Sequence, residues 1–381
     1  MPSSVGPNTF GEENLVFGYD LGDVSNSYKG EPTTIYGEPF PTETTLPAGF
    51  YWSYEYDHEI VDAPISGHFL SNKKWIKSTR DTTGSTRVLF INNSFTAGST
   101  YTFSCYAYST DTNLTSLSHV SHNGGYSSTQ NVTSYGTADL GTVKRIHGTW
   151  IQQVNGGPIF GMQTNNTALG TTFYMTGFQV EEKTRATQLT GGSRSATQGL
   201  IDLTGNSTID ITNVSFDSNA QMTFDGTDDI LYTGLYDDRN TGTDPFTIEA
   251  WVKSDQTVTS RMWIDATGNG TNQRFYATLI NGSTFNIGIQ GSGWSDSTPN
   301  DTNWHYQAIV MDGTIVRGYD NGVEVQNKSY SSYTLAGPLN VGGRSGYRWL
   351  GDIAMFKVYN RALTSSEIAA NYNATKGRFN I

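Results

Sequence analysis

The sequence predicts an all-β protein built from two antiparallel sandwiches, with one short helix at the C-terminus. Its composition favours short strands joined by tight turns. Only 15% of the 381 residues are Asp, Glu, Lys or Arg, whereas 42 are Gly and 22 are Tyr, and Ser, Thr and Asn are abundant. β-Branched and aromatic residues suit a pleated surface, and Gly and Asn suit tight turns. The length leaves room for two or three domains.

The C-terminal half shows alternating segments separated by turn dipeptides. Asn281-Gly282, Asp312-Gly313 and Asn321-Gly322 supply the positive φ angles that two-residue hairpins need. Residues 246–252 and 304–310 alternate between two faces. Such spacing is typical of antiparallel strands in a sandwich.

A helix is predicted only near the end of the chain. Thr364 and Glu367 form an S/T-x-x-E capping box, and Leu363 and Ile368 stand where a hydrophobic staple would close. We expect this helix to run to about Tyr372 and to pack on the edge of a sandwich.

The N-terminal half is also rich in strand-like segments. They lie at 87–91, 101–108, 145–154 and 172–180, and we interpret the flanking stretches 31–47 and 187–197 as linkers. Neither a solenoid period nor heptads occur, which excludes a long β-helix shaft and a coiled coil.

The charge of the chain argues against two classes of partner. The net charge is −12, and the densest basic pair is Lys73-Lys74, so phosphate backbones would be repelled and nucleic acid is not expected. No apolar run approaches the ~18 residues that a membrane span requires. We therefore expect no membrane insertion.

Cys105 is the only cysteine, so a disulfide within the chain is excluded. Alternation places it beside Tyr101 and Phe103 on one strand face, which favours a buried small apolar residue over a nucleophile. The first ten residues lack the features of a signal peptide. These observations favour assembly in a cytoplasm, followed by release as part of a larger particle.

Several segments of the C-terminal half form one ordered set. They are residues 222–229, 248–252, 301–305, 319–323, 339–343, 350–354 and 358–364. Their order and spacing resemble the laminin-G / concanavalin-A-like jelly roll. The ending Asn360-Arg361-Ala362-Leu363, followed by Glu367-Ile368, is the most specific part of that resemblance.

Two further segments of this resemblance stand far apart. Residues 15–20, LVFGYD, look like the family's first strand, and residues 202–206, DLTGN, look like the turn that soon follows it. We therefore expect 14–30 and 190–381 to form one sandwich, with 31–189 inserted as a second domain. Residues 1–13 would form an N-terminal arm.

The inserted segment resembles a carbohydrate-binding-module-like jelly roll. The resemblance rests on residues 101–106 and on the closing strand 178–182 before 185–187. A module ending in this way, paired with a laminin-G-like sandwich, is similar to virion proteins of tailed phages, particularly those of marine bacteria. This resemblance implies an architecture rather than one activity.

Catalytic motifs are lacking in the sequence. Glycoside hydrolases need two carboxylates about 5–9 Å apart across the scissile bond. Glu249 has no acid at i+2 or i+4, and the adjacent Glu181 and Glu182 would point to opposite faces of a strand. A nucleophile elbow, a P-loop and a dinucleotide fingerprint are also absent. We predict no catalytic residues, no required cofactor and a non-enzymatic protein.

Calcium is the metal that the sequence favours. Asp225, Asp228 and Asp229 offer the hard oxygen ligands that Ca²⁺ selects. The alternative is that the same residues serve as ordinary turn formers. Both interpretations stay open at this point.

Glycan binding needs an exposed aromatic ring and planar polar groups. The loop residues that meet this requirement are Trp294, Tyr347, Arg344 and Asn272. For Trp294 the alternative is a ring folded over the sandwich end or buried against another subunit.

The preferred interpretation is a virion surface protein that assembles in the host cytoplasm, as a phage capsid decoration or head accessory protein with a capacity to bind host or environmental glycans. Phe10, Glu12 and Glu13 in the arm would dock on the major capsid protein or another virion protein. The resemblance implies a homo-oligomer, and we expect a trimer. The alternatives are a tail or fibre adhesin for host glycans and a secreted glycan-active enzyme.

Overall fold

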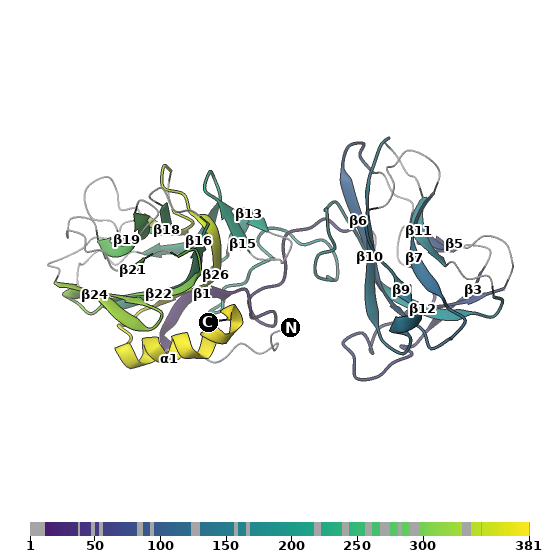
Figure 1. Ribbon diagram of the computed structural model, residues 1–381, viewed down its shortest axis with the longest axis horizontal. Coiled ribbons are helices and arrows are strands. Elements are labelled where there is room, and N and C mark those ends of the chain that lie inside the picture. The colour runs from purple at the N-terminus through teal and green to yellow at the C-terminus, as the bar shows by residue number, and fades with distance from the viewer. Residues whose placement is uncertain are drawn as a thin grey trace. The chain divides into compact units, whose positions relative to one another are not determined.

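The computed structural model describes residues 12–36, 39–46, 50–52, 56–81, 87–91, 95–122, 130–155, 159–164, 168–216, 222–237, 244–255, 261–266, 275–280, 284–289, 298–299, 301–329, 337–343 and 345–380. Regular structure within them consists of antiparallel strands, one α-helix and three short 3-10 helices (Figure 1). The predicted all-β fold class is confirmed.

The chain divides into two compact units. Unit 1 comprises Met1–Pro32 and Ala196–Ile381, and unit 2 comprises Thr33–Ser195. The sequence places the insertion at 31–189, and the second unit begins at Thr33 and ends at Ser195. Of the predicted arm at 1–13, residues 1–11 lie outside the described residues, and Glu12–Asn14 form the 3-10 helix η1.

Unit 1 contains two antiparallel sheets. The eight-stranded sheet has the order β14 (Ser215–Phe216), β15 (Met222–Asp225), β26 (Leu350–Tyr359), β17 (Phe246–Ser254), β22 (Trp304–Met311), β23 (Ile315–Asp320) and β24 (Val323–Ser329), and β1 (Leu15–Asp20) also pairs with β26. The seven-stranded sheet has the order β13 (Asp210–Asn213), β16 (Ile230–Asp237), β25 (Gly337–Val341), β18 (Arg261–Ala266), β19 (Phe275–Ile280), β20 (Thr284–Ile289) and β21 (Thr298–Pro299). Buried side chains of both sheets share one core, in which Trp263 meets Phe356.

The first strand is joined to the C-terminal half by pairing and by a carboxylate. Leu15 stands opposite Tyr359 in the β1–β26 ladder. The Gly18 amide donates to Asp202 Oδ1 at 3.0 Å, and the Ser207 amide donates to Asp202 Oδ2 at 3.0 Å. One side chain thus caps the turn at 202–207 and holds β1 against it.

The helix α1 (Ser365–Thr375) begins at the predicted capping box. Glu367 N donates to Thr364 Oγ1 at 3.3 Å, and Thr364 N donates to Glu367 Oε2 at 2.8 Å. The helix ends at Thr375 rather than near Tyr372, and the 3-10 helix η3 (Lys376–Phe379) follows it.

The helix covers a face of the eight-stranded sheet, and the expectation that it packs on a sandwich edge is wrong. Ile368 of α1 shares a buried cluster with Trp251, Tyr306 and Ala308, which point away from the core between the sheets. Both faces of β17 and β22 are therefore buried, which explains why alternating apolar residues occur on both faces of 304–310.

Unit 2 also contains two antiparallel sheets. One has the order β3 (Tyr56–Val61), β4 (Trp75–Arg80), β12 (Thr172–Glu181), β6 (Thr100–Tyr108), β10 (Lys144–Ile151) and β8 (Gln130–Thr133). The other has the order β2 (Phe50–Trp52), β5 (Arg87–Ile91), β11 (Ile159–Thr164), β7 (Ser116–His122) and β9 (Tyr135–Gly136), and η2 (Thr137–Asp139) follows β9. Strand β10 ends at Ile151, earlier than the predicted 154.

Cys105 lies fully buried in the core of unit 2, as predicted. Burial raises the pKa of its thiol far above the ordinary value, so the sulfur stays protonated and unreactive.

The predicted linkers pack on unit 2 in part. Tyr36 N donates to Val180 O at 2.8 Å, and buried Thr187 donates through its amide to Glu181 Oε1 at 2.8 Å. No helix in the described part of the chain is long and apolar enough to cross a membrane.

Candidate functional site

The candidate site lies where two connections of unit 1 meet at one end of the sandwich. One is the turn from β15 to β16, which carries Asp225, Asp228 and Asp229. The other is the loop 342–349 between β25 and β26. Their contact is set by Gly342, whose φ is +97°: a Cβ there would stand 2.6 Å from the ring of Phe224 and 3.1 Å from the Asp229 carbonyl oxygen. Glycine therefore allows the loop to lie against the acidic turn.

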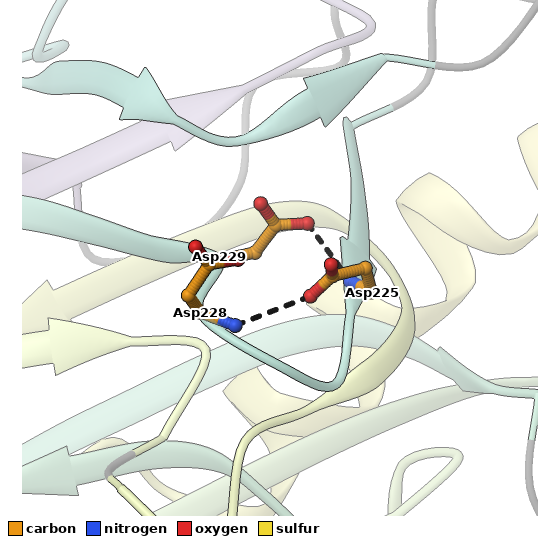
Figure 2. Close-up of side chains that lie close together, drawn as sticks. All are labelled: Asp225, Asp228 and Asp229. Atoms are coloured by element: carbon orange, nitrogen blue, oxygen red, sulfur yellow. Dashed lines mark hydrogen bonds between the residues drawn. The ribbon is translucent and has the colours of Figure 1, made fainter.

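The three aspartates of the turn converge, as Figure 2 shows. One carboxylate oxygen from each lies within 4.8 Å of the others, with Asp225 and Asp228 exposed and Asp229 buried. The turn also uses these groups, because Thr227 N donates to Asp225 Oδ1 at 2.7 Å and Asp225 N donates to Asp229 Oδ2 at 2.8 Å. Both sequence interpretations, turn former and oxygen donor set, thus have a geometric basis.

The pKa values of two aspartates in the turn are shifted in opposite directions. Amide donors, first that of Thr227, lower the pKa of Asp225. Burial raises the pKa of Asp229, and the charge of Asp225 adds to that rise. A cation at this position would relieve the repulsion between the carboxylates.

The described residues of the connection between β25 and β26 (342–343 and 345–349) are fixed at its base, and residues 345–347 are exposed. Trp349 N donates to Gly342 O at 3.0 Å, and Arg348 Nη1 donates to Gly343 O at 2.8 Å. Trp349 is fully buried, whereas Tyr347 is 37% exposed. The anchored base therefore leaves Tyr347 exposed in the same connection whose Gly342 lies against the acidic turn.

Of the four predicted glycan-binding residues, Tyr347 alone is described. Trp294, Arg344 and Asn272 lie outside the described residues. The sequence did not indicate that the connection carrying Tyr347 meets the acidic turn, because this depends on the pairing of β15 with β26, in which Asp225 stands opposite Leu350.

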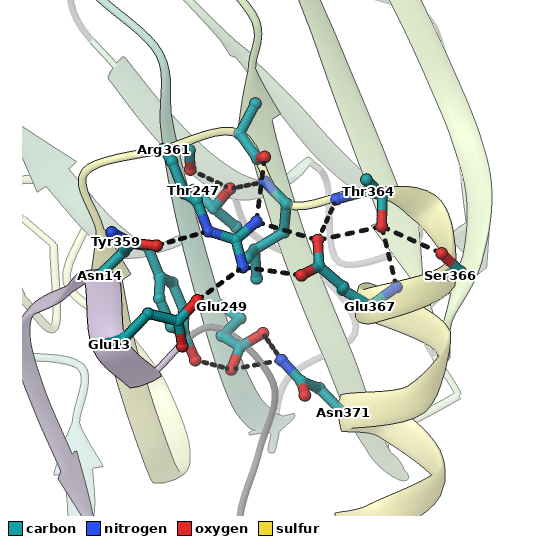
Figure 3. A network of polar contacts seen from close by, with 12 residues as sticks. Glu13, Asn14, Thr247, Glu249, Tyr359, Arg361, Thr364, Ser366, Glu367 and Asn371 are labelled. Atoms are coloured by element: carbon teal, nitrogen blue, oxygen red, sulfur yellow. Dashed lines mark hydrogen bonds and ion pairs between the residues drawn. The ribbon is translucent and has the colours of Figure 1, made fainter.

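Two of the three predicted docking residues are described. Phe10 lies outside the described residues, and Glu12 belongs to η1. Glu13, with a largely exposed side chain, lies 3.6 Å from Arg361 Nη2, which also contacts Glu367 Oε1 at 2.7 Å (Figure 3). The hydrogen bonds of Arg361 lower the pKa of Glu367 to about 2. Glu13 thus belongs to a network around the start of α1.

Two of the acidic residues considered as hydrolase carboxylates make structural hydrogen bonds. Glu249 is fully buried and accepts from the hydroxyls of Tyr306 and Tyr359 and from Asn371 Nδ2, so it docks α1 on the sheet. Figure 3 shows its contacts with Tyr359 and Asn371. Glu181 is buried and accepts from Thr33 Oγ1 at 2.8 Å.

A buried histidine between two acids was missed by the sequence reasoning. His305 Nδ1 lies 3.0 Å from Asp320 Oδ1, and its Nε2 lies 3.1 Å from Asp301 Oδ1. Burial would lower the pKa of His305, but hydrogen bonds and charges of Asp320 and Asp301 outweigh burial and raise it. Burial would likewise raise the pKa of Asp301, but hydrogen bonds from Asn303 and His305 outweigh it and lower that pKa. The i,i+4 spacing of Asp301 and His305 was the available signal, whereas Asp320 comes from the next strand.

The fold of unit 1 is a concanavalin-A-like jelly roll. Residues 225–369 match the family described as the concanavalin A-like lectin/glucanases superfamily, which confirms the resemblance found in the C-terminal half. No curated protein matches the sequence.

Several solved structures are similar at low identity. Domain 4 of AbnA, a GH43 extracellular arabinanase from Geobacillus stearothermophilus in complex with arabinotriose, is 19% identical over 47% of this chain and 93% of that chain, with a TM-score of 0.36. The Ruminococcus gnavus IT-sialidase CBM40 bound to α2,3 sialyllactose is 14% identical over 34% of this chain and 83% of that chain, with a TM-score of 0.30. The binding domain of botulinum neurotoxin serotype D is 15% identical over 47% of this chain, with a TM-score of 0.39, and the match spans 49% of that chain, about half of its length.

The position of His305 predicts a pH-dependent contribution to stability. A raised pKa means that this contribution is complete below the unfolded-state value near ~6.5 and is lost as the pH rises through the folded-state pKa. His305→Gln should therefore lower the free energy of unfolding by on the order of 1 kcal/mol more at acidic than at alkaline pH. Urea denaturation at about pH 5.5 and about pH 9 measures this difference. In an Asp301→Asn background, the loss of stability caused by His305→Gln should depend less on pH. Equal losses at both pH values would contradict the raised pKa of His305.

Proposed function

We propose that the protein is a non-enzymatic glycan-binding protein of the virion surface. The observation that carries the glycan part is the exposed Tyr347 in the connection whose Gly342 lies against the acidic turn, within the stretch that matches the lectin-containing family. A sugar ring would stack on Tyr347 through its C–H face. The exposed carboxylates of Asp225 and Asp228 would accept hydrogen bonds from its hydroxyls.

We further propose that Ca²⁺ binds at the acidic turn. Three carboxylate oxygens within 4.8 Å of one another suit an ion that takes six to eight oxygen ligands. The remaining positions are open to water, backbone oxygens or sugar hydroxyls. Asp229 would contribute the oxygen that does not accept from Asp225 N.

The virion part of the proposal rests on the resemblance of the two-module architecture to tailed-phage virion proteins. The buried lone cysteine supports it, because the sandwiches need no oxidising compartment to fold. In this proposal the arm at 1–13, with Phe10, Glu12 and Glu13, docks on the major capsid protein or another virion protein, and three copies assemble together.

The stacking role of Tyr347 is testable by substitution. Tyr347→Ala should weaken glycan binding about tenfold, which corresponds to ~1.4 kcal/mol of lost stacking. Val323→Ala is the matched control, because Val323 is 64% exposed on β24. A glycan array finds the ligand and titration calorimetry measures its affinity. Unchanged affinity in Tyr347→Ala would remove this residue from the site.

The calcium site predicts a ligand-dependent melting temperature. Calcium at about a hundred times its Kd should stabilise the folded protein by ~2.7 kcal/mol, and a chelator should reverse the effect. Asp228→Asn should abolish the stabilisation, since Asp228 is exposed and offers an oxygen to the cluster. Asp210→Asn is the control, because its carboxylate accepts from its own neighbour Thr212. Equal melting temperatures with calcium and with chelator would contradict the site.

The virion location predicts particle binding. The full chain should co-sediment with particles or with assembled major capsid protein, and a chain lacking residues 1–13 should stay in the supernatant. Failure of the full chain to sediment would refute the capsid role and leave glycan binding intact. Release of reducing ends from any polysaccharide, lost on substitution of one acid, would refute the non-enzymatic assignment.

A further inference from the structure

The outer face of the six-stranded sheet in unit 2 carries aromatic and basic side chains. In β6 the core takes Tyr101, Phe103 and Cys105, so Tyr106 lies on the opposite face. Arg145 of β10 stands directly across from Tyr106 in the antiparallel register and shares that face.

The loop 62–74 between β3 and β4 lies over one part of this face. It is held down by buried Leu70, whose carbonyl accepts from Trp75 Nε1 at 3.2 Å. Phe69 next to it is 62% exposed, yet its ring stands edge-on to Tyr106 at 5.4 Å and 4.5 Å from the His68 ring. The loop therefore forms a supported aromatic platform, in which the Phe69 ring is open to solvent.

Tyr106 is enclosed on its other side. Gly177 of β12 has a φ of +62°, and a Cβ there would stand 3.0 Å from both Tyr106 and Leu189. The missing side chain leaves room there for the Tyr106 ring and for Leu189. Burial raises the pKa of Tyr106, so its hydroxyl remains a hydrogen-bond donor at neutral pH.

Arg145 is a half-buried cation. Its guanidinium lies 5.7 Å from the centre of the Tyr106 ring, and Nη2 donates to Ser104 Oγ at 2.9 Å. Among the described residues no carboxylate lies within ion-pair distance of it. Burial lowers the pKa of Arg145, and Tyr106 and the carboxylate of Glu181 oppose that shift. Because no described carboxylate pairs with the guanidinium directly, an anionic ligand would supply the missing ion pair.

We infer that this surface binds a saccharide that carries a carboxylate group. The sugar ring would stack on Phe69, the Tyr106 hydroxyl would donate to a ring substituent, and Arg145 would pair with the carboxylate. Arg145 is the cation that this surface offers to a ligand, and the chain as a whole has a net charge of −12. One cation suits a ligand with a single carboxylate, whereas a polyphosphate strand needs several cations. This site is separate from that at Tyr347 and takes a charged ligand, so it goes beyond the proposed function.

The experiment is titration calorimetry of the full chain with matched acidic and neutral sugars. The probes are trigalacturonate with its methyl ester, and 3′-sialyllactose with lactose. At least one acidic probe should bind at least about tenfold more tightly than its neutral counterpart. High salt should weaken acidic binding alone.

Two variants test the two parts of the surface. Phe69→Ala should weaken acidic binding about tenfold, and its exposed position makes it safe for folding. Arg145→Gln, which can still donate to Ser104, should bring the acidic and neutral affinities together. Leu169→Ala, at a 56% exposed residue of unit 2, is the control and should bind like the parent.

The outcomes separate this inference from the proposed function. Absence of acidic binding, equal affinity for acid and neutral counterpart, or unchanged binding in Phe69→Ala would each overturn it, whatever Arg145→Gln does to folding. Acidic binding that is lost in Tyr347→Ala and kept in Phe69→Ala would also overturn it, because it would place the ligand in unit 1.

Discussion

The pairing of β1 with β26 is the constraint on which the rest of the structure depends. It joins the two ends of the chain and closes unit 1 around a long insertion. Asp202 accepts from the Gly18 amide in the middle of β1. Arg378 donates two hydrogen bonds, of 2.7 and 2.6 Å, to Asp20 at the end of β1. Just beyond, Lys29 N donates to Gly199 O. The two chain segments that connect the units therefore leave unit 1 side by side. For this reason unit 2 can be inserted without breaking the sandwich.

Burial of the eight-stranded sheet on both faces decides what its polar residues do. One face packs on the other sheet and the opposite face packs under α1. Glu249 lies under the helix, where three donors compensate a carboxylate that would otherwise be costly to bury. Glu249 is thereby used for docking α1, whereas the carboxylates proposed for ligand binding lie in the turn at 225–229.

The two candidate surfaces have opposite electrostatic character. The turn at 225–229 gathers carboxylates and meets the connection that carries the exposed Tyr347, which suits hydroxyls and a divalent cation. The face around Arg145 places a cation beside an exposed phenylalanine, which suits a carboxylate. Each of the two surfaces combines an exposed aromatic side chain, next in sequence to buried residues or close to them, with charged side chains that a ligand would contact.

Local chemistry determined much of this protein. The capping box at Thr364 and the Asn321-Gly322 turn, with φ angles of 49° and 79°, follow from residues close in sequence. The motif at 202–206 identified the distant first strand. Tertiary structure alone decided that Asp229 adjoins Gly342, that Asp320 completes the His305 contact, and that Arg145 lies beside Tyr106. These contacts depend on strand register and sheet order, which are set by burial over the whole unit.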